Sequence, residues 1–194
     1  AYKIDDPSYP PGKAQDMLDF AYLGGIYRDC WMVAHNKVYI TDPNYEDEVA
    51  GGGLFVSYGD VSETEAQVRL DAHLRNATSG TFSGKLLYQL CDKEGKQVAV
   101  AEKSLKLRPG KAQQVAAKIK VQKPHLWEPD SPYLYDLFVY VKDSKGHTVD
   151  GYRRRVGIRS IEFKGKDGFW LNGKPYPFPL IGANRHQDFA VIGN

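Results

Sequence analysis

Apolar side chains recur at every second position over several stretches of this sequence, and this alternation constrains the fold more than any other feature. Between residues 66 and 75 the apolar positions are Ala66, Val68, Leu70, Ala72 and Leu74. Successive side chains of a β-strand point to opposite faces, so this period places all of them on one face. The same period recurs in residues 113–121 and 133–142. The pattern predicts half-buried β-strands that cover a common core.

Strand-length runs occupy most of the middle of the chain. They span residues 54–58, 66–75, 84–91, 97–105, 113–121, 133–142 and 148–158. Two turn sequences, Asp92–Gly95 and Asp143–Gly146, each begin with a side-chain acceptor and end with glycine, which predicts hairpin loops. No long amphipathic helical pattern interrupts these runs. We therefore predict an all-β fold, an immunoglobulin-like β-sandwich of about seven antiparallel strands, with partial domains on both flanks.

The two flanks show no complete core of their own. Residues 1–47 combine short apolar runs with a stretch rich in proline and acidic residues, and we assign them to the end of a preceding β domain. Residues 48–160 form the predicted sandwich. In residues 161–194 the pair Asn172-Gly173 is a strong hairpin signal, and prolines and a polar string follow it. We expect a linker hairpin and then the first strand of another domain, so that the chain is the interior of a longer protein.

Charge and hydropathy limit the partners of such a domain. The formal net charge is +2, with 26 basic and 24 acidic residues, and such a balanced surface does not favour nucleic acid or a membrane surface. No apolar run approaches the roughly 20 residues that cross a bilayer, and the first residues lack the layout of a secretory signal. We predict neither a nucleic-acid partner nor a membrane partner.

The cysteines and histidines indicate no metal or redox chemistry. Cys30 and Cys91 fall in segments that we assign to different domains, and we expect each to be a buried free thiol. Metal-ligand spacing is absent among the histidines of the first 150 residues, which are His35, His73, His125 and His147. We predict no metal site and no cofactor.

Three groups of residues carry a resemblance to a known family. Residues 18–28 read LDFAYLGGIYR, residues 126–135 read LWEPDSPYLY with VGIRSIE at 156–162, and residues 169–175 read FWLNGKP with GANRH at 182–186. In this order they resemble the glycoside hydrolase family 2 enzymes, which include β-galactosidases, β-glucuronidases and β-mannosidases. The segments are similar to the end of that family's jelly-roll domain, its immunoglobulin-like domain and the start of its catalytic TIM barrel. Residues 183–188, ANRHQD, look closest to the β-galactosidase branch.

The resemblance implies a parent enzyme that hydrolyses terminal β-galactosides, or related β-glycosides, by a two-glutamate retaining mechanism. In the family both glutamates belong to later barrel strands, so we expect no catalytic residue in this chain and no activity from it alone. Its role would be to hold the jelly-roll and the barrel in register. The implied partners are a carbohydrate and the remaining parent domains. Whether the parent is a homo-oligomer stays open, and a polysaccharide-degrading parent favours a periplasmic or secreted location.

The resemblance also implies substrate-binding residues for the intact enzyme. Asp19 matches a carboxylate that contacts sugar hydroxyls or a bound cation, although a strand-end aspartate that caps a backbone amide explains it equally well. His186 matches a histidine that hydrogen-bonds the sugar, whereas an unplaced loop histidine commonly has no role. Arg185 would hold that loop through an ion pair, beside Asn184. For Arg28 we favour a salt bridge between domains over catalysis.

Two other classes of function remain open. An autonomous carbohydrate-binding module predicts Trp31, Trp127 or Trp170 aligned on one solvent-facing surface, although we favour Trp127 as a plug at the end of the sandwich core. A protein-interaction domain predicts a sizeable exposed apolar patch. Residues 153–155 are all arginine, and we interpret them as a solvated edge or a domain contact, because alternate strand positions point to both faces.

Overall fold

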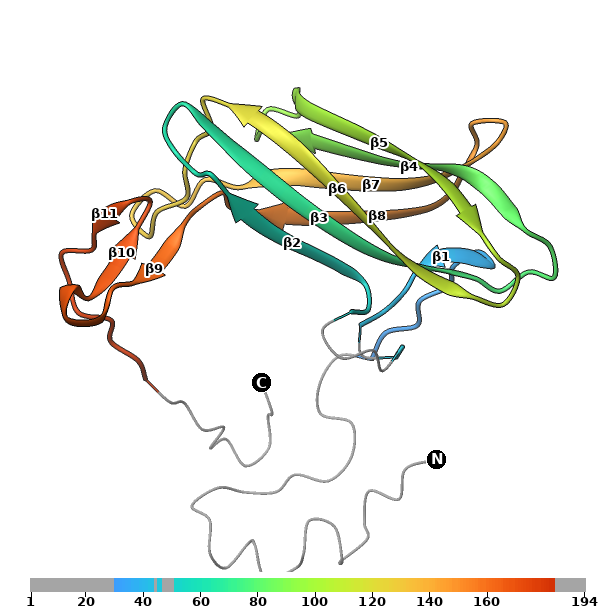
Figure 1. Cartoon of the computed structure of the whole chain (residues 1–194), viewed down its shortest axis with the longest axis horizontal. Coiled ribbons are helices and arrows are strands. Elements are labelled where there is room, and N and C mark those ends of the chain that lie inside the picture. The colour runs from blue at the N-terminus through green and yellow to red at the C-terminus, as the bar shows by residue number, and fades with distance from the viewer. Residues whose placement is uncertain (1–29, 44, 47–50, 184–194) are drawn as a thin grey trace, which may run out of the picture. The chain divides into compact units, whose positions relative to one another are not determined.

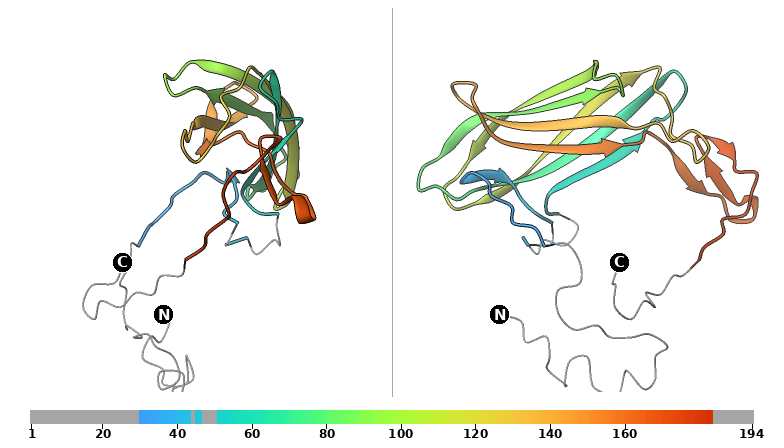
Figure 2. Two further views of the ribbon diagram at one scale, coloured as in Figure 1. Left: turned by 90° about the vertical axis from the view of Figure 1, so that its left-hand side faces the viewer. Right: turned by 180° about the vertical axis from the view of Figure 1, so that it is seen from behind.

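Two antiparallel β-sheets that face each other form the centre of the structure (Figure 1). The computed structural model describes residues 30–43, 45–46 and 51–183. The chain divides into two compact units, and every strand given below lies in the larger one, His35–Pro179. The end-on view in Figure 2 shows the two sheets as facing layers. Within the described ranges the only helical element is a 3-10 turn at Gly165–Asp167, which confirms the predicted all-β fold.

The first sheet is built around one long central strand. Its strands are β1 (Val38–Ile40), β2 (Leu54–Gly59), β3 (Glu65–Asn76) and β6 (Ala112–Gln122). β6 pairs antiparallel with one edge of β3 along almost its whole length, while β1 and β2 share the opposite edge. Ile40 is opposite Leu74 and Leu54 is opposite Ala72, so the segment between β1 and β2 leaves and rejoins the same edge of β3.

The second sheet contains two hairpins that lie side by side. In spatial order its strands are β5 (Gln97–Leu107), β4 (Phe82–Cys91), β7 (Tyr135–Asp143) and β8 (Thr148–Val156). The carboxylate of Asp92 accepts a hydrogen bond from the Lys96 amide at 2.8 Å, and that of Asp143 accepts one from the His147 amide at 2.9 Å. Both predicted hairpin loops are confirmed, and β2 to β8 are the seven strands of the predicted sandwich.

The alternating apolar side chains fill the space between the sheets, as predicted. Val68, Leu70 and Leu74 of β3 have no exposed surface, and the alternate positions of β6 and β7 are buried in the same way. Removing such side chains from water stabilises the fold by about 1.5–3 kcal/mol each. Tyr88 of β4 also lies in this core, and its hydroxyl donates to the carbonyl of Val115 on β6 at 3.2 Å. This hydrogen bond joins the two sheets.

His73 of β3 is buried, although the alternation places it on the face away from the core. His73 is 8% exposed because the chain around Thr41 and Gly53 covers it where β1 and β2 meet. Thr41 Oγ1 lies 2.8 Å from His73 Nδ1 and accepts a hydrogen bond from the Gly53 amide at 2.9 Å. The His73 amide in turn donates to the Gly53 carbonyl at 2.8 Å. His73 therefore has a structural role at this junction.

A small three-stranded sheet follows the sandwich. It consists of β9 (Ile161–Phe163), β10 (Phe169–Leu171) and β11 (Lys174–Pro175). Asn172 and Gly173 connect β10 to β11 with φ angles of 53° and 74°, which are the positive values that a tight hairpin turn requires. The predicted hairpin is confirmed.

The two cysteines are both free, but they differ in exposure. Cys91 is 4% exposed at the end of β4, and it is buried as predicted. The prediction that Cys30 is buried is wrong: this residue precedes the first described strand, where no sheet partner covers it, and it is exposed. In the described part of the chain, no helix is long and apolar enough to span a membrane.

Candidate functional site

The residues predicted to contact sugar lie outside the described part of the chain. These are Asp19, Asn184, Arg185 and His186, together with Arg28 as a predicted bridge between domains. Their roles therefore stay predictions. The described residues instead contain a junction between the sandwich and the small sheet, at the left-hand end of the sandwich in Figure 1.

Trp127 lies at the centre of this junction. The segment that connects β6 to β7 carries it, and its backbone amide donates to the Ile158 carbonyl at 2.8 Å, just beyond the end of β8. Gly157 lies so close to the Trp127 side chain that an added Cβ would come within 2.8 Å of the indole. The Arg159 guanidinium covers the ring at 5.0 Å from its centroid and donates to the Gly157 carbonyl at 3.0 Å.

Asn172 attaches the small sheet to this junction. Its side-chain amide donates to the Trp127 carbonyl at 3.1 Å, and its side-chain oxygen accepts from the Ser160 amide at 3.1 Å. Its own backbone amide donates to the Ser160 carbonyl at 3.0 Å. One asparagine thus bonds the hairpin to two separate segments of the sandwich end.

An ion pair supplies a second attachment. Lys174 Nζ lies 3.0 Å from Glu63 Oε1, which joins β11 to the loop between β2 and β3. The hydrogen bond and the charge of Glu63 raise the pKa of Lys174 above its ordinary value. Because both side chains are exposed, the pair contributes little to stability, but it restrains the same hairpin.

The predicted role of Trp127 holds only in part. The residue is at the end of the sandwich, but it is half-exposed and lies outside the buried core; Leu126 beside it packs against that core. The aligned tryptophan platform of a carbohydrate-binding module is not supported. Cations cover the rings of Trp127 and Trp170, the latter with Lys164 Nζ at 3.5 Å from the centroid. Trp31 belongs to the other compact unit.

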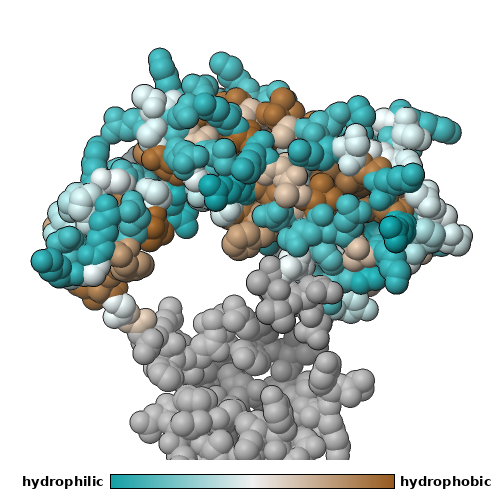
Figure 3. Space-filling view, viewed as in Figure 1, coloured by the Kyte–Doolittle hydropathy of each residue, from teal (hydrophilic) through white to brown (hydrophobic). Residues whose placement is uncertain are grey.

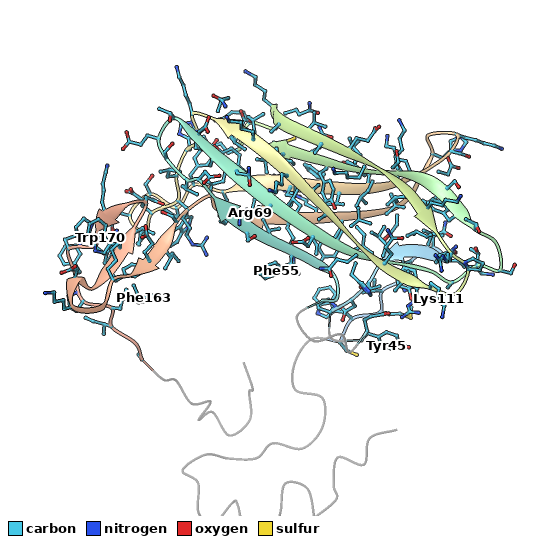
Figure 4. All side chains as sticks on the ribbon, in the orientation of Figure 1. Tyr45, Phe55, Arg69, Lys111, Phe163 and Trp170 are labelled. Carbon is cyan, nitrogen blue, oxygen red and sulfur yellow. The ribbon has the colours of Figure 1, made fainter. Side chains whose placement is uncertain are left out.

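The small sheet carries a row of exposed aromatic rings. Phe163 contacts Phe169 with centroids 5.3 Å apart, Phe169 contacts Tyr176 at 5.4 Å, and Tyr176 contacts Phe178 at 6.1 Å. Phe163 is 73% exposed and Phe178 is 65% exposed. Figure 3 shows apolar atoms gathered at this end of the body among hydrophilic ones, and Figure 4 labels Phe163 and Trp170 on the sheet. We call these rings the aromatic row.

The arginines of β8 form a solvated edge, as predicted. β8 is an edge strand, and Arg153, Arg154 and Arg155 are all exposed. Arg153 forms an ion pair with Asp136 at 2.9 Å and lies over the ring of Phe138.

Among the described residues, no group of three or more histidine, cysteine, aspartate or glutamate side chains is arranged to hold a metal ion. His35 stacks on Tyr39 with centroids 3.8 Å apart, and His125 stacks on Tyr133 at 4.5 Å. His147 pairs with the carboxylate of Asp143 at 3.2 Å. Each of these histidines therefore has a local structural contact.

The sequence did not reveal two features of the junction. The side-chain bonds of Asn172 join residues 12 and 45 positions apart, and no local pattern encodes such contacts. The aromatic row draws on three short segments that folding brings together, and no local pattern in the sequence indicated it.

A family model for glycosyl hydrolases family 2 matches residues 53–159, which is more than half of the chain. The chain belongs to this family. Curated proteins similar to this chain include a β-glucuronidase from Formosa agariphila, which is 30% identical over 170 residues. The alignment covers 88% of this chain and 17% of that protein. A β-galactosidase from Thermoanaerobacter pseudethanolicus is 28% identical, with 91% of this chain and 21% of that protein covered.

Solved structures with the same fold include two named glycosidases. The β-glucuronidase of Bacteroides uniformis superposes with a TM-score of 0.76 and 30% identity, over 90% of this chain and 20% of that one. A putative β-galactosidase from Bacteroides fragilis gives a TM-score of 0.69 and 29% identity, over 79% and 22%. The chain thus spans about a fifth of the length of these relatives. The resemblance seen in the sequence is confirmed for the family, and the relatives include both β-glucuronidases and β-galactosidases.

Proposed function

We propose that the described body is the positioning module of a family 2 glycosidase. It would hold the segment of residues 1–47, proposed as the end of a jelly-roll domain that joins the sandwich through β1, in register with residues 161–194, as the start of a catalytic barrel. The attachment of the small sheet through Trp127 and Asn172 carries this proposal. A module that positions other domains must transmit orientation, and a close ring contact with hydrogen bonds to two segments does so better than a flexible linker.

The aromatic row supports the same proposal. Exposed contiguous aromatic side chains are typical of surfaces that dock against another domain. Because the row belongs to a sheet attached to the sandwich end, a domain that packs on it would be oriented relative to the sandwich.

For the assembled enzyme we propose hydrolysis of terminal β-galactosides or related β-glycosides by two glutamates outside this segment. Asp19 and His186 would contact the sugar, with Asn184 and Arg185 beside His186. The carbohydrate and the remaining domains would be the partners. Relatives named β-galactosidase and β-glucuronidase support the substrate class but not the choice between these sugars.

The positioning role predicts a narrow distribution of distances between the sandwich and the small sheet. Spin labels at Lys145→Cys on the β7–β8 loop and Lys166→Cys on the small sheet, in a Cys30→Ser background, would report it by double electron–electron resonance. Cys91 is buried and should stay unlabelled. A broad distribution would show that the module transmits no orientation.

An activity assay provides the second test. The chain with chromogenic β-galactosides and β-glucuronides should give no turnover, and neutral oligosaccharides should leave its tryptophan fluorescence unchanged. Turnover would overturn the non-catalytic role, and a saturable fluorescence change would favour the carbohydrate-binding module.

A further inference from the structure

A cationic cavity lies at the end of the sandwich away from the small sheet. Two loops form it: residues 77–81, which connect β3 to β4, and residues 108–111, which connect β5 to β6. Lys111, which lies in the second loop, is labelled in Figure 4. The cavity has a volume of about 770 Å³, and its lining residues are Thr81, Lys106, Leu107, Arg108, Lys111, Ala112 and Gln113.

The lining of this cavity is positively charged. Lys106, Arg108 and Lys111 contribute cations, Thr81 and Gln113 contribute hydrogen-bonding groups, and none of the lining residues is acidic. None of these three cations forms an ion pair with another described residue. Like charges held around one cavity repel each other, so an anion between them lowers the electrostatic free energy.

One buried asparagine fixes both loops. Asn76 has no exposed surface, and its side-chain amide donates to the Gly80 carbonyl at 2.8 Å and to the Leu107 carbonyl at 3.1 Å. Its backbone amide donates to the Lys111 carbonyl at 3.0 Å. Its side-chain oxygen accepts from the amide of Thr78 at 3.0 Å. The backbone of both loops is therefore fixed before any ligand arrives, which lowers part of the entropy cost of binding, while the exposed cationic side chains would still have to be ordered.

The size and charge of the cavity define the chemical class of its ligand. A volume of this order accommodates a molecule of several rings rather than a single inorganic ion. A guanidinium and two ammonium groups recognise carboxylate or sulfate oxygens, and hydroxyl and amide groups suit sugar hydroxyls. We infer that this cavity binds an anionic oligosaccharide, carboxylated or sulfated, at a site separate from the residues proposed to contact substrate. The choice of a saccharide over other polyanions rests on the proposed function.

Calorimetric titration of the whole chain at low salt tests the inference. The probes are a sulfated heparin-derived tetrasaccharide, tetragalacturonate and neutral cellotetraose, with inorganic sulfate and hexaglutamate as further arms. A carboxylated or sulfated tetrasaccharide should bind at one site, more weakly as salt rises, and cellotetraose should not bind. The arm that binds identifies the anionic group.

A pair of double variants tests the location. Arg108→Gln with Lys111→Gln should weaken binding about tenfold, because two charge-assisted contacts are lost. The matched control, Lys103→Gln with Lys118→Gln, removes the same charge from exposed residues outside the cavity and should change affinity less than about twofold. Chemical-shift changes in the unaltered chain, confined to Thr81 and residues 106–113, provide a readout that needs no variant.

Several results would overturn the inference. These are no binding of either anionic tetrasaccharide, equal losses in the two double variants, shift changes elsewhere, or equally tight binding of cellotetraose, inorganic sulfate or hexaglutamate. The titration is also independent of the proposed function. Turnover by the chain would overturn the positioning role and leave this result unaffected, whereas a failed titration would leave the spin-label distances unaffected.

Discussion

Gly157 shows how a single hydrogen atom in place of a side chain shapes the junction. An added Cβ would lie 2.8 to 2.9 Å from the Cδ1, Cβ and Cγ atoms of Trp127, closer than packed carbon atoms approach each other. Only glycine lets the indole lie against the backbone at this point. The orientation of Trp127 therefore depends on a neighbour that has no side chain of its own.

Gly157→Ala should lower the free energy of unfolding by about 1–3 kcal/mol, because the indole must move away from the new methyl group. Urea unfolding followed by tryptophan fluorescence measures this. Gly151→Ala is the matched control, since its added Cβ would meet nothing closer than 3.7 Å. Equal stability of the two variants would contradict the tight contact.

The buried phenol of Tyr88 makes stability depend on alkaline pH. Burial raises the pKa of Tyr88 well above its ordinary value of 10.0, and the charge of Asp71 raises it further. Below pH 10 the phenol is protonated in both the folded and the unfolded chain. Above pH 10 the unfolded chain releases the proton first, so stability falls as pH rises.

Tyr88→Phe should remove this contribution. From pH 10 upward the free energy of unfolding of this variant should fall less steeply with pH than that of the unaltered chain. The difference between the two slopes should correspond to the release of at most about one proton on unfolding. Urea titrations at several alkaline pH values give the two slopes. Parallel slopes would show that Tyr88 ionises as readily in the folded state as in the unfolded one.

At the scale of elements, the β10–β11 hairpin owes its position to contacts outside its own sheet. The strands are short, and among the residues of the small sheet that the structure describes only Leu171 is buried. A sheet of this size is marginally stable alone. The hydrogen bonds of Asn172 with Trp127 and Ser160 stabilise the small sheet where the packing within that sheet is insufficient.

Asn172→Ala should open the small sheet while the sandwich stays folded. Amide hydrogen exchange in residues 161–175 should accelerate about tenfold or more, with β3, β4 and β7 unchanged. Asn172→Gly separates two causes, because glycine tolerates the positive φ but lacks the side-chain bonds. Protection retained in the glycine variant would mean that backbone strain, not the amide, explains the alanine result.

The whole sandwich is held together at both of its edges and in its core. β5 continues into β6 across one edge, and the Ile40 amide donates to the Asp150 carboxylate of β8 at 2.7 Å across the other. Between them Tyr88 bonds the sheets through the core. These connections favour cooperative unfolding of the two sheets.

Thiol reactivity should report this cooperativity. Cys30 should react with an aromatic disulfide reagent at once, whereas Cys91 should react only when the second sheet unfolds, because it is buried at the end of β4 and burial raises its thiol pKa. The slow rate should follow the global unfolding free energy as urea is added, and Cys30→Ser should retain only the slow phase. A fast reaction of Cys91 would indicate local opening of the second sheet.

The alternation of apolar residues in the sequence predicted the strands of the sandwich and their buried faces. It did not predict the polar contacts between residues that are far apart in the sequence. Val68 and Leu70 are buried because strands place alternate residues on one face, which a sequence displays directly. β1 has three residues, too few for a period, so its pairing with β3 could not be read from the sequence. Asn76 and Asn172 are common turn residues whose buried bonds depend on segments brought together only by folding.

The split edge of β3 has an evolutionary consequence. Because β1 ends opposite Leu74 and β2 starts opposite Ala72, the chain between them is an excursion whose two ends are anchored almost at the same place. Hydrogen bonds among Thr41, Gly53 and His73 hold the two ends of this segment together. We therefore expect that a change in the length of this segment would leave the register of β1 and β2 on β3 unchanged, and that a foreign peptide could be grafted here without rebuilding the sandwich.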